Sequence, residues 1–249
     1  MTKIIIIGAA GKMGGRIVAN ACQDREVKVV GGTEPTGSSA IGKDLGVLAG
    51  GSPLQALVVD DLRKIIAQGD AIIDFTVAAA TLPVLEIAAQ AKRAAVVGTT
   101  GHSEAEKQEI RKLSKKIPIV MAPNMSLGVN VMWKLISEAA KILGEDFPVA
   151  VTETHHIHKK DAPSGTALKM MEVLGEALGK MRDEIPCESL REGEEVGDHI
   201  ATFTGAGEIL TVRHQAKSRD TFALGAVRAA KWVVGKPAGL YDMFDVLGL

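Results

Sequence analysis

Short apolar runs rich in β-branched residues alternate with longer amphipathic stretches through the first half of the chain. The run at residues 4–7, IIII, is apolar at every position, which is typical of a parallel strand covered on both faces. This alternation predicts an α/β domain, a Rossmann-like doubly wound parallel sheet with helices on both faces. We expect strands at residues 3–8, 27–34, 71–76, 94–100 and 118–124, and helices at 12–24, 60–69, 81–93 and 103–116.

Two of the expected helices carry start signals. Pro83 is expected in the first turn of the helix at residues 81–93, where its missing N–H has no intrahelical partner to lose. Ser103, with Glu106 three residues later, has the spacing of a capping box and predicts a helix start at that point.

The second half of the chain has a different pattern. One long helix is expected at residues 127–143, a strand at 147–156 and a helix at 166–180. This order predicts a smaller α+β domain over residues 127–219. Residues 1–126 and residues 220–249 then form the first domain, so the last expected helix belongs to it. The remaining expected elements are turn-separated strands at 187–195, 198–205 and 208–216, and a helix at 221–235.

Composition excludes several classes of function. The 29 lysines and arginines balance 30 acidic residues, and aromatic residues make up only 3% of the chain. Nucleic-acid binding and membrane-surface binding both need clustered positive charge, so neither is expected. The run at residues 4–7 is too short for a signal peptide or a spanning helix. Cys22 and Cys187 lie far apart, which favours a reduced, cytoplasmic protein.

A glycine-rich turn, GAAGKMG, links the first expected strand to the first expected helix. Glycine at positions 8, 11 and 14 lets the backbone turn sharply and lets a pyrophosphate approach bare amides at a helix N-terminus. Such a turn alone is equally consistent with a tight loop. Glu34, at the end of the second strand, is the carboxylate that such a site uses for the ribose hydroxyls, and the two together favour dinucleotide binding.

The residue after Glu34 bears on the choice of coenzyme. Arginine there is the usual partner of a 2′-phosphate, and this chain has Pro35. Strict dependence on NADPH is therefore not expected. NADH and NADPH both remain candidates, since a phosphate can still be held by Lys12, Thr36, Ser38 and Ser39.

Small and polar residues follow three later strands, at 74–76 (DFT), 98–101 (GTTG) and 122–126 (APNMS). The ligand crevice of an open α/β sheet lies at the carboxyl ends of its strands, so these residues can line a nicotinamide site. Without the glycine turn, we would interpret them simply as turn formers.

The segment 153–167, ETHHIHKKDAPSGTA, concentrates histidine and lysine. A metal site is not expected there, because adjacent histidines on a strand point to opposite faces, so His155 and His156 cannot share an ion. A solvated basic loop is one alternative. The other is an anion site, since Ser164 or Thr166 can cap a helix whose amides bind a carboxylate. Histidine would supply a proton donor beside it.

The chain resembles the dihydrodipicolinate reductases over nearly its whole length. The resemblance rests on residues 153–167, on GAAGKMG, DFT and GTTG, on APNMSLGVN, and on SRDTFALGAVRAAKWVVGKPAGLYDM near the C-terminus. It implies reduction of 4-hydroxy-tetrahydrodipicolinate by NADH or NADPH on the diaminopimelate route to lysine. It also implies that the first domain binds the dinucleotide. The second, with a mixed sheet, binds the cyclic dicarboxylate and builds a homotetramer.

The resemblance also implies roles for individual residues. His155 is the proposed proton donor or acceptor and Lys159 the second catalytic residue, and the substrate is contacted by His156, Gly165 and Thr166. The expected coenzyme contacts are Gly8, Ala9, Ala10, Gly11, Lys12, Met13, Glu34, Phe75, Gly98, Thr99, Thr100, Ala122, Pro123, Asn124 and Met125. Many members of the family have arginine at the position of Lys12, and some have arginine at the position of Pro35. These two departures leave the coenzyme preference open.

Two other functions also fit part of the sequence. Another two-domain dehydrogenase, acting on aspartate or homoserine, would explain the glycine turn but not the DAPSGT segment after a basic cluster. A dinucleotide sensor without activity would explain the turn alone.

Overall fold

The computed structural model describes all residues, 1–249, and the chain divides into two compact units. The first comprises Met1–Met125 and Phe222–Gly248, and the second comprises Ser126–Thr221 with Leu249. No helix in either unit combines the length and the apolar character needed to cross a membrane.

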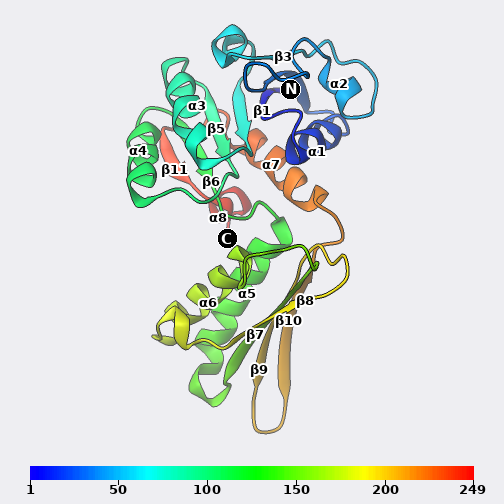
Figure 1. Ribbon diagram of the computed structural model, residues 1–249. Helices are drawn as coiled ribbons and strands as arrows, with labels where there is room; N and C mark the ends of the chain where they lie inside the picture. The colour runs from blue at the N-terminus through cyan, green and yellow to red at the C-terminus, as the bar shows by residue number, and fades with distance from the viewer. The chain divides into compact units, whose positions relative to one another are not determined.

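The first unit contains a seven-stranded sheet in which every neighbouring pair is parallel (Figure 1). Its order, β11-β6-β5-β4-β1-β2-β3, confirms the predicted doubly wound sheet. The order reverses between β1 and β4, and ligands of such sheets bind beyond the carboxyl ends at this point. The strands are β1 (Thr2–Ile7), β2 (Val27–Thr33), β3 (Val58–Val59), β4 (Ala71–Asp74), β5 (Ala94–Val97), β6 (Pro118–Met121) and β11 (Gly239–Tyr241).

Helices cover both faces of this sheet. Ile4 and Ile6 of β1 belong to one buried cluster, together with residues of α1, α7 and α8. Ile5 and Ile7 belong to a second cluster on the opposite face, together with residues of α3 and α4. All four isoleucines are buried, which explains the continuous apolar run. The helices are α1 (Lys12–Ala21), α2 (Leu45–Leu48), α3 (Ala78–Gln90), α4 (Glu104–Ser114), α7 (Asp220–Val233) and α8 (Met243–Leu247).

Two expectations about helices in this unit are wrong. Residues 60–69 form two 3-10 turns, η1 (Leu62–Lys64) and η2 (Ile66–Gln68), because Ile65 between them takes a φ of −128° and is buried against the sheet. Helix α3 begins at Ala78, since three alanines extend it upstream, and Pro83 therefore lies inside it.

The start of α4 is as predicted. The Ser103 side chain accepts a hydrogen bond from the Glu106 N–H, and the Glu106 carboxylate accepts one from the Ser103 N–H. This reciprocal pair confirms the capping box.

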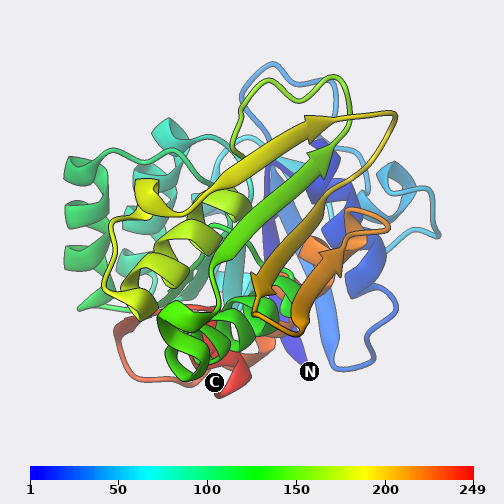
Figure 2. The same ribbon diagram turned by 90° about the horizontal axis from the view of Figure 1, so that it is seen from below.

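The second unit is a four-stranded mixed sheet, as predicted, with two long helices (Figure 2). Strands β7 and β8 pair in parallel, whereas β9 pairs antiparallel with both β7 and β10. Helices α5 and α6 pack on each other and against the sheet. The elements are α5 (Leu127–Leu143), η3 (Gly144–Asp146), β7 (Val149–His155), α6 (Gly165–Leu178), η4 (Arg182–Glu184), β8 (Cys187–Arg191), β9 (Asp198–Thr204) and β10 (Ile209–Gln215).

Candidate active site

The glycine turn joins β1 to α1 with a backbone that only glycine permits. Gly8 has a φ of +68°, in the left-handed region, and its carbonyl accepts a hydrogen bond of 3.0 Å from the Gly11 N–H. A Cβ on Gly14 would lie 2.2 Å from the Gly8 oxygen, so the first turn of α1 approaches this loop more closely than any side chain allows. Since Gly11 caps α1 without a side chain, the helix N-terminus stays accessible to an anion.

Glu34 lies directly beside this turn. Its Oε1 accepts a hydrogen bond of 2.7 Å from the Ala10 N–H, and the carbonyl of Thr33 accepts bonds from the Gly8 and Ala9 N–H groups. The chain segments after β1 and β2 are thereby held side by side. The spacing places a carboxylate next to an exposed helix N-terminus, which is the donor and acceptor set that an adenosine diphosphate moiety requires.

A cavity of about 820 Å³ opens over this region in the first unit. Gly8, Gly11, Glu34 and Phe75, expected coenzyme contacts, line it. The residues present therefore fit a dinucleotide. Sequence reasoning missed four charged residues that line the same cavity, because they lie on the irregular segment that was expected to be helical: Asp60, Asp61, Arg63 and Lys64.

Asp74 fixes the segments after β4 and β5. Its side chain is fully buried and accepts hydrogen bonds from the side chains of Thr76, Thr81 and Thr99 and from the Thr76 N–H. The Thr76 N–H also donates to Thr99 Oγ1, at 2.9 Å. One buried carboxylate thus orders the DFT and GTTG segments together, a role that their sequence did not reveal.

The other expected coenzyme contacts lie around the same sheet edge with differing exposure. A Cβ on Gly98 would lie 2.2 Å from the Phe75 ring, so this glycine allows the ring to pack against the backbone. Ala10, Lys12, Thr100 and Pro123 are exposed. Met13 packs against the core, and the buried remainder are Ala9, Thr99, Ala122, Asn124 and Met125.

In the second unit, the histidine segment begins on β7 and gathers partners from two other strands. Glu153 and His155 lie two residues apart, so their side chains share one face of the sheet. Arg191 of β8 is in register with His155, and His199 of β9 is in register with Glu153. Register, not sequence proximity, therefore assembles this cluster, and neither Arg191 nor His199 was predicted as a site residue.

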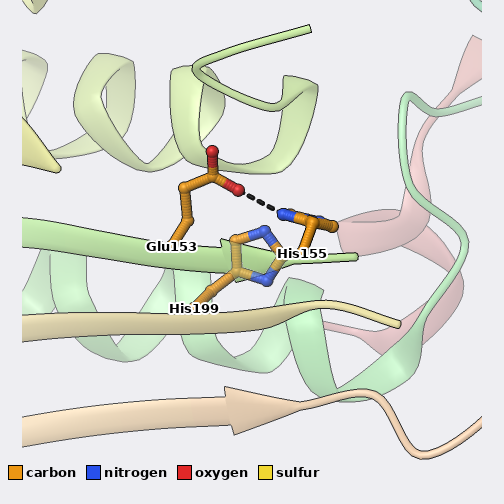
Figure 3. Close-up of side chains that lie close together, drawn as sticks. All are labelled: Glu153, His155 and His199. Carbon is orange, nitrogen blue, oxygen red and sulfur yellow. Dashed lines mark ion pairs between the residues drawn. The ribbon is translucent and has the colours of Figure 1, made fainter. Parts of the chain in front are cut away.

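Glu153 is fully buried and lies between His155 and Arg191, and Figure 3 shows its pairing with His155. One of its oxygens forms an ion pair with the Nδ1 of His155, and the other lies 2.9 Å from a guanidinium nitrogen of Arg191. Burial alone would raise the pKa of the Glu153 carboxyl, but the neighbouring Ser189, Arg191 and His155 side chains together lower it, and the net shift is downward. Burial lowers the pKa of His155, and the charge of Glu153 opposes this.

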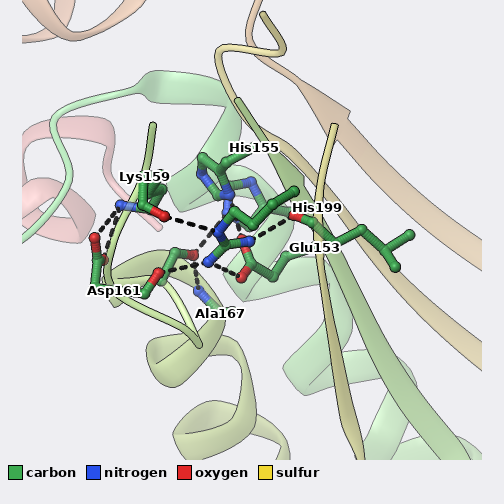
Figure 4. Close-up of polar contacts among 9 residues, drawn as sticks. Glu153, His155, Lys159, Asp161, Ala167 and His199 are labelled. Atoms are coloured by element: carbon green, nitrogen blue, oxygen red, sulfur yellow. Dashed lines mark hydrogen bonds and ion pairs between the residues drawn. The ribbon is translucent and has the colours of Figure 1, made fainter. Parts of the chain in front are cut away.

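Lys159 lies in the turn that follows, where it pairs with Asp161 (Figure 4). Arg191 holds that turn. The Nζ of Lys159 donates to a carboxylate oxygen of Asp161 at 2.9 Å. Arg191 donates to the carbonyls of Lys159 and Asp161, at 3.3 and 2.5 Å. His156 is half-buried, and its N–H donates to the Glu195 carbonyl.

Helix α6 starts where this turn ends. Ser164 is the N-cap, as one of the two alternatives predicted, and its Oγ accepts a hydrogen bond from the Ala167 N–H. The same hydroxyl lies 3.2 Å from His199 Nε2. Gly165 is exposed, with no atom near the position of a Cβ, and Thr166 is half-buried. The helix N-terminus is therefore open to an anion.

His199 is held neutral at physiological pH. Burial, followed by the positive charge of His155, lowers its pKa to about 4. A neutral imidazole can hydrogen bond to Ser164 without adding charge to the helix start.

Glu153, His155 and His199 offer three ligand atoms within 4.8 Å of one another, a spacing that a metal ion can use. The Glu153 carboxylate is already paired with Arg191 and His155. The positive charge of Lys159 lies nearby and contributes to lowering the pKa of His155. Because the positive charges of Arg191 and Lys159 repel another cation, we interpret the cluster as an acid–base group. The absence of a metal stays a prediction.

Comparisons with known proteins cover the whole chain. The model of the N-terminal domain of dihydrodipicolinate reductase matches residues 2–125, and that of the C-terminal domain matches residues 128–247. Two curated relatives named 4-hydroxy-tetrahydrodipicolinate reductase, from Anaeromyxobacter dehalogenans and Geobacter sulfurreducens, are 45% and 44% identical. The matches span 100% of this chain and 98% and 100% of theirs.

Solved structures agree with these matches. A dipicolinate-bound dihydrodipicolinate reductase from Paenisporosarcina sp. TG-14 superposes with a TM-score of 0.82, at 25% identity, over 98% of each chain. An amine dehydrogenase from Mycobacterium smegmatis has a TM-score of 0.63 at 15% identity, over 96% of this chain and 94% of its own, and shares the fold alone.

Proposed function

The chain belongs to the dihydrodipicolinate reductase family, and from this premise we propose that it reduces 4-hydroxy-tetrahydrodipicolinate to tetrahydrodipicolinate with NADH or NADPH. This is the NAD(P)H-dependent step of the diaminopimelate route to lysine. We assign coenzyme binding to residues 1–126 with 220–249, and substrate binding and oligomerisation to residues 127–219. The coenzyme contacts are those expected from the sequence.

His155 and Lys159 are the proposed catalytic residues. When bound, the reduced nicotinamide supplies the hydride. His155 donates the proton that balances the reduction, in which the ring hydroxyl is lost as water. Lys159 contributes positive charge beside the dianionic substrate. His156, Gly165 and Thr166 contact the substrate carboxylates, which the N-terminus of α6 attracts. Negative charge from a bound dicarboxylate also favours the protonated imidazole.

One observation carries this proposal. Within a single turn of chain, the second unit places a buried, carboxylate-paired imidazole, a lysine and an open helix N-terminus. A carboxylic acid substrate that needs one proton is served by these three parts: a proton donor, a positive charge and a group of amides that binds an anion.

The test is a coupled assay of NADH oxidation in the presence of aspartate semialdehyde, pyruvate and the preceding synthase. We expect the wild-type chain to turn over, and the variant with both His155→Gln and Lys159→Gln to lose about 10²–10⁴-fold in kcat. The affinity for NADH, measured by calorimetry, should stay unchanged, because the coenzyme contacts lie in the other unit.

Matched controls lie in the same loop. His158 and Lys160 are exposed, so His158→Gln and Lys160→Gln should leave kcat unchanged. Near-normal turnover of the double variant would refute the catalytic assignment. Oxidation of aspartate or homoserine by NAD⁺ would favour an amino acid dehydrogenase instead, and NADH binding without turnover would favour a sensor.

We further infer that NADH is the preferred coenzyme. Glu34, Asp60 and Asp61 line the cavity together, and no arginine follows Glu34. The two cations of the cavity are already paired, Lys64 with Asp60 at 2.5 Å and Arg63 with Asp61 at 3.4 Å. A 2′-phosphate would therefore meet carboxylates, and like charges repel.

The preference is measured as the ratio of kcat/KM for NADH to that for NADPH. We expect a ratio above one for the wild-type chain, and a lower ratio for Glu34→Gln, which removes the charge nearest the ribose site. Glu86→Gln, an exposed acid of α3, is the control and should leave the ratio as it was. A wild-type preference for NADPH would overturn the inference.

We also propose that the chain forms a homotetramer and is located in the cytoplasm. Strand β10 is an edge of the mixed sheet and exposes two large apolar side chains, Ile209 (67%) and Leu210 (42%). An exposed apolar edge of this kind favours pairing with another chain. Light scattering should give four times the 26.2 kDa of one chain, and Ile209→Lys should lower that mass. The free thiols of Cys22 and Cys187 support a reducing compartment.

A further inference from the structure

We propose that Glu153 is a positioning residue of this reductase, which fixes the tautomer and the orientation of His155 and, through Arg191, ties that imidazole to the turn carrying Lys159. This inference rests on the proposed role of His155. It assigns a function to a buried carboxylate that is none of the proposed substrate or coenzyme contacts.

The contacts of Glu153 favour a role in positioning the His155 imidazole. The residue is fully buried, although an ionised carboxylate in a sheet interior is costly unless it is paired. Both oxygens are engaged, one with His155 Nδ1 and the other with Arg191 at 2.9 Å. Replacing such a buried pair by apolar residues is often neutral for stability, so the pair is better explained by its effect on the imidazole.

The pairing of Glu153 with Nδ1 determines which nitrogen of His155 is left for proton transfer. A carboxylate that accepts from Nδ1 keeps the proton there, and Nε2 then becomes the nitrogen that gains and donates the catalytic proton. A Cβ on Gly197 would lie 3.1 Å from this Nε2. The backbone next to Nε2 therefore carries no side chain that could crowd it.

Arg191 connects Glu153 to the turn that carries Lys159. Its guanidinium contacts the carboxylate and also donates to the carbonyls of Lys159 and Asp161. The imidazole and the turn are thus both tied to the Glu153–Arg191 pair. Loss of Arg191 should loosen the turn that leads into the substrate-binding helix start, and so weaken substrate binding more than the proton transfer.

The charged and titratable groups that face His155 come from three strands and one turn. They are Glu153 of β7, Arg191 of β8, His199 of β9 and Lys159. Glu153 is the only one that favours the imidazolium, because Lys159 and Arg191 repel it and His199 is neutral at physiological pH. Removing the Glu153 charge must therefore lower the pKa of His155.

The experiment compares kcat as a function of pH for the full-length wild-type chain and Glu153→Gln. Since His155 must be protonated to act as an acid, the rate falls at high pH, and this alkaline limb should move to lower pH in Glu153→Gln. We also expect kcat to fall about 10- to 100-fold, the usual cost of removing a carboxylate behind a functional histidine. Glu188→Gln, an exposed acid of β8, should change neither quantity.

Two further variants keep the inference falsifiable if Glu153→Gln folds poorly. Glu153→Asp retains the charge, so its alkaline limb should lie near that of the wild type even where kcat is reduced. Arg191→Lys retains a charge but loses the fork to the two carbonyls, and it should raise KM more than it lowers kcat.

The outcomes separate this inference from the proposed function. If His155→Gln keeps its kcat and its alkaline limb, the catalytic role of His155 fails. If His155→Gln loses activity while Glu153→Gln lowers kcat equally at every pH, Glu153 is merely structural and this inference fails. A limb that moves equally in Glu153→Gln and Glu153→Asp would also overturn it, because the charge would then not be the cause.

Discussion

Replacing His199 by glutamine should make the second unit less sensitive to acid. The folded chain holds His199 at a pKa of about 4, against its ordinary value of 6.5. The unfolded chain therefore binds a proton between these values that the folded chain does not. Stability contributed by the neutral imidazole is present above pH 6.5 and is lost as the pH falls toward 4.

The pKa difference sets the size of the effect. At 1.36 kcal/mol per unit, the full loss amounts to about 3 kcal/mol, of which about 2 kcal/mol should appear by pH 5. No discount for solvent screening applies, because only 4% of His199 is exposed. The side chain amide of glutamine can still hydrogen bond to Ser164 but does not titrate, so this loss should vanish in His199→Gln.

Urea unfolding at about pH 7.5 and about pH 5 measures the effect. Trp133 is buried in the second unit and reports its unfolding in a Trp232→Phe background, because the chain has only two tryptophans. His158→Gln, with an exposed imidazole, is the control and should lose as much stability as the wild type. Equal losses in wild type and His199→Gln would refute the reasoning.

Three further substitutions test the first unit. Gly14→Ala should weaken NADH binding in calorimetry, because its Cβ would lie 2.2 Å from the Gly8 oxygen and displace the glycine turn. Asp74→Ala should lower the urea midpoint measured by circular dichroism, since each donor left without a partner costs about 1–3 kcal/mol; an unchanged midpoint would contradict the network. Ser103→Ala should cost about 1 kcal/mol in the same measurement, through loss of the cap on α4.

The doubly wound sheet was predictable because burial on both faces leaves a continuous apolar run in each central strand. The run at residues 4–7 shows this most clearly, since neighbouring isoleucines contact different clusters. The mixed sheet of the second unit was also predicted correctly, on the family resemblance. Short β11 was missed, because three residues carry no measurable period.

Residues 35–57 show why the remaining local structure was not predictable. Asp44 caps α2 through the Gly46 and Val47 N–H groups and also accepts hydrogen bonds from the N–H groups of Leu54 and Ala56. One carboxylate thus organises a loop across twelve residues of sequence. No hydrophobic period or turn motif encodes such contacts.

The candidate site also has one part that the sequence indicated and one part that it did not. His155, Lys159 and the Ser164 cap lie in one continuous motif, so the sequence indicated them. Arg191 and His199 join that motif only through strand register, which a single sequence does not reveal. The assigned roles themselves stay predictions until activity is measured.

Transfer of deuterium from NADH to the product reports the proposed reduction itself. Wild-type chain is given NADH deuterated at both hydrogens of the reduced ring carbon, together with aspartate semialdehyde, pyruvate and the synthase, and the product is analysed by mass spectrometry. We expect a single deuterium in the tetrahydrodipicolinate for each NADH oxidised. Oxidation of NADH with no deuterium in that product, or no oxidation at all, would contradict it.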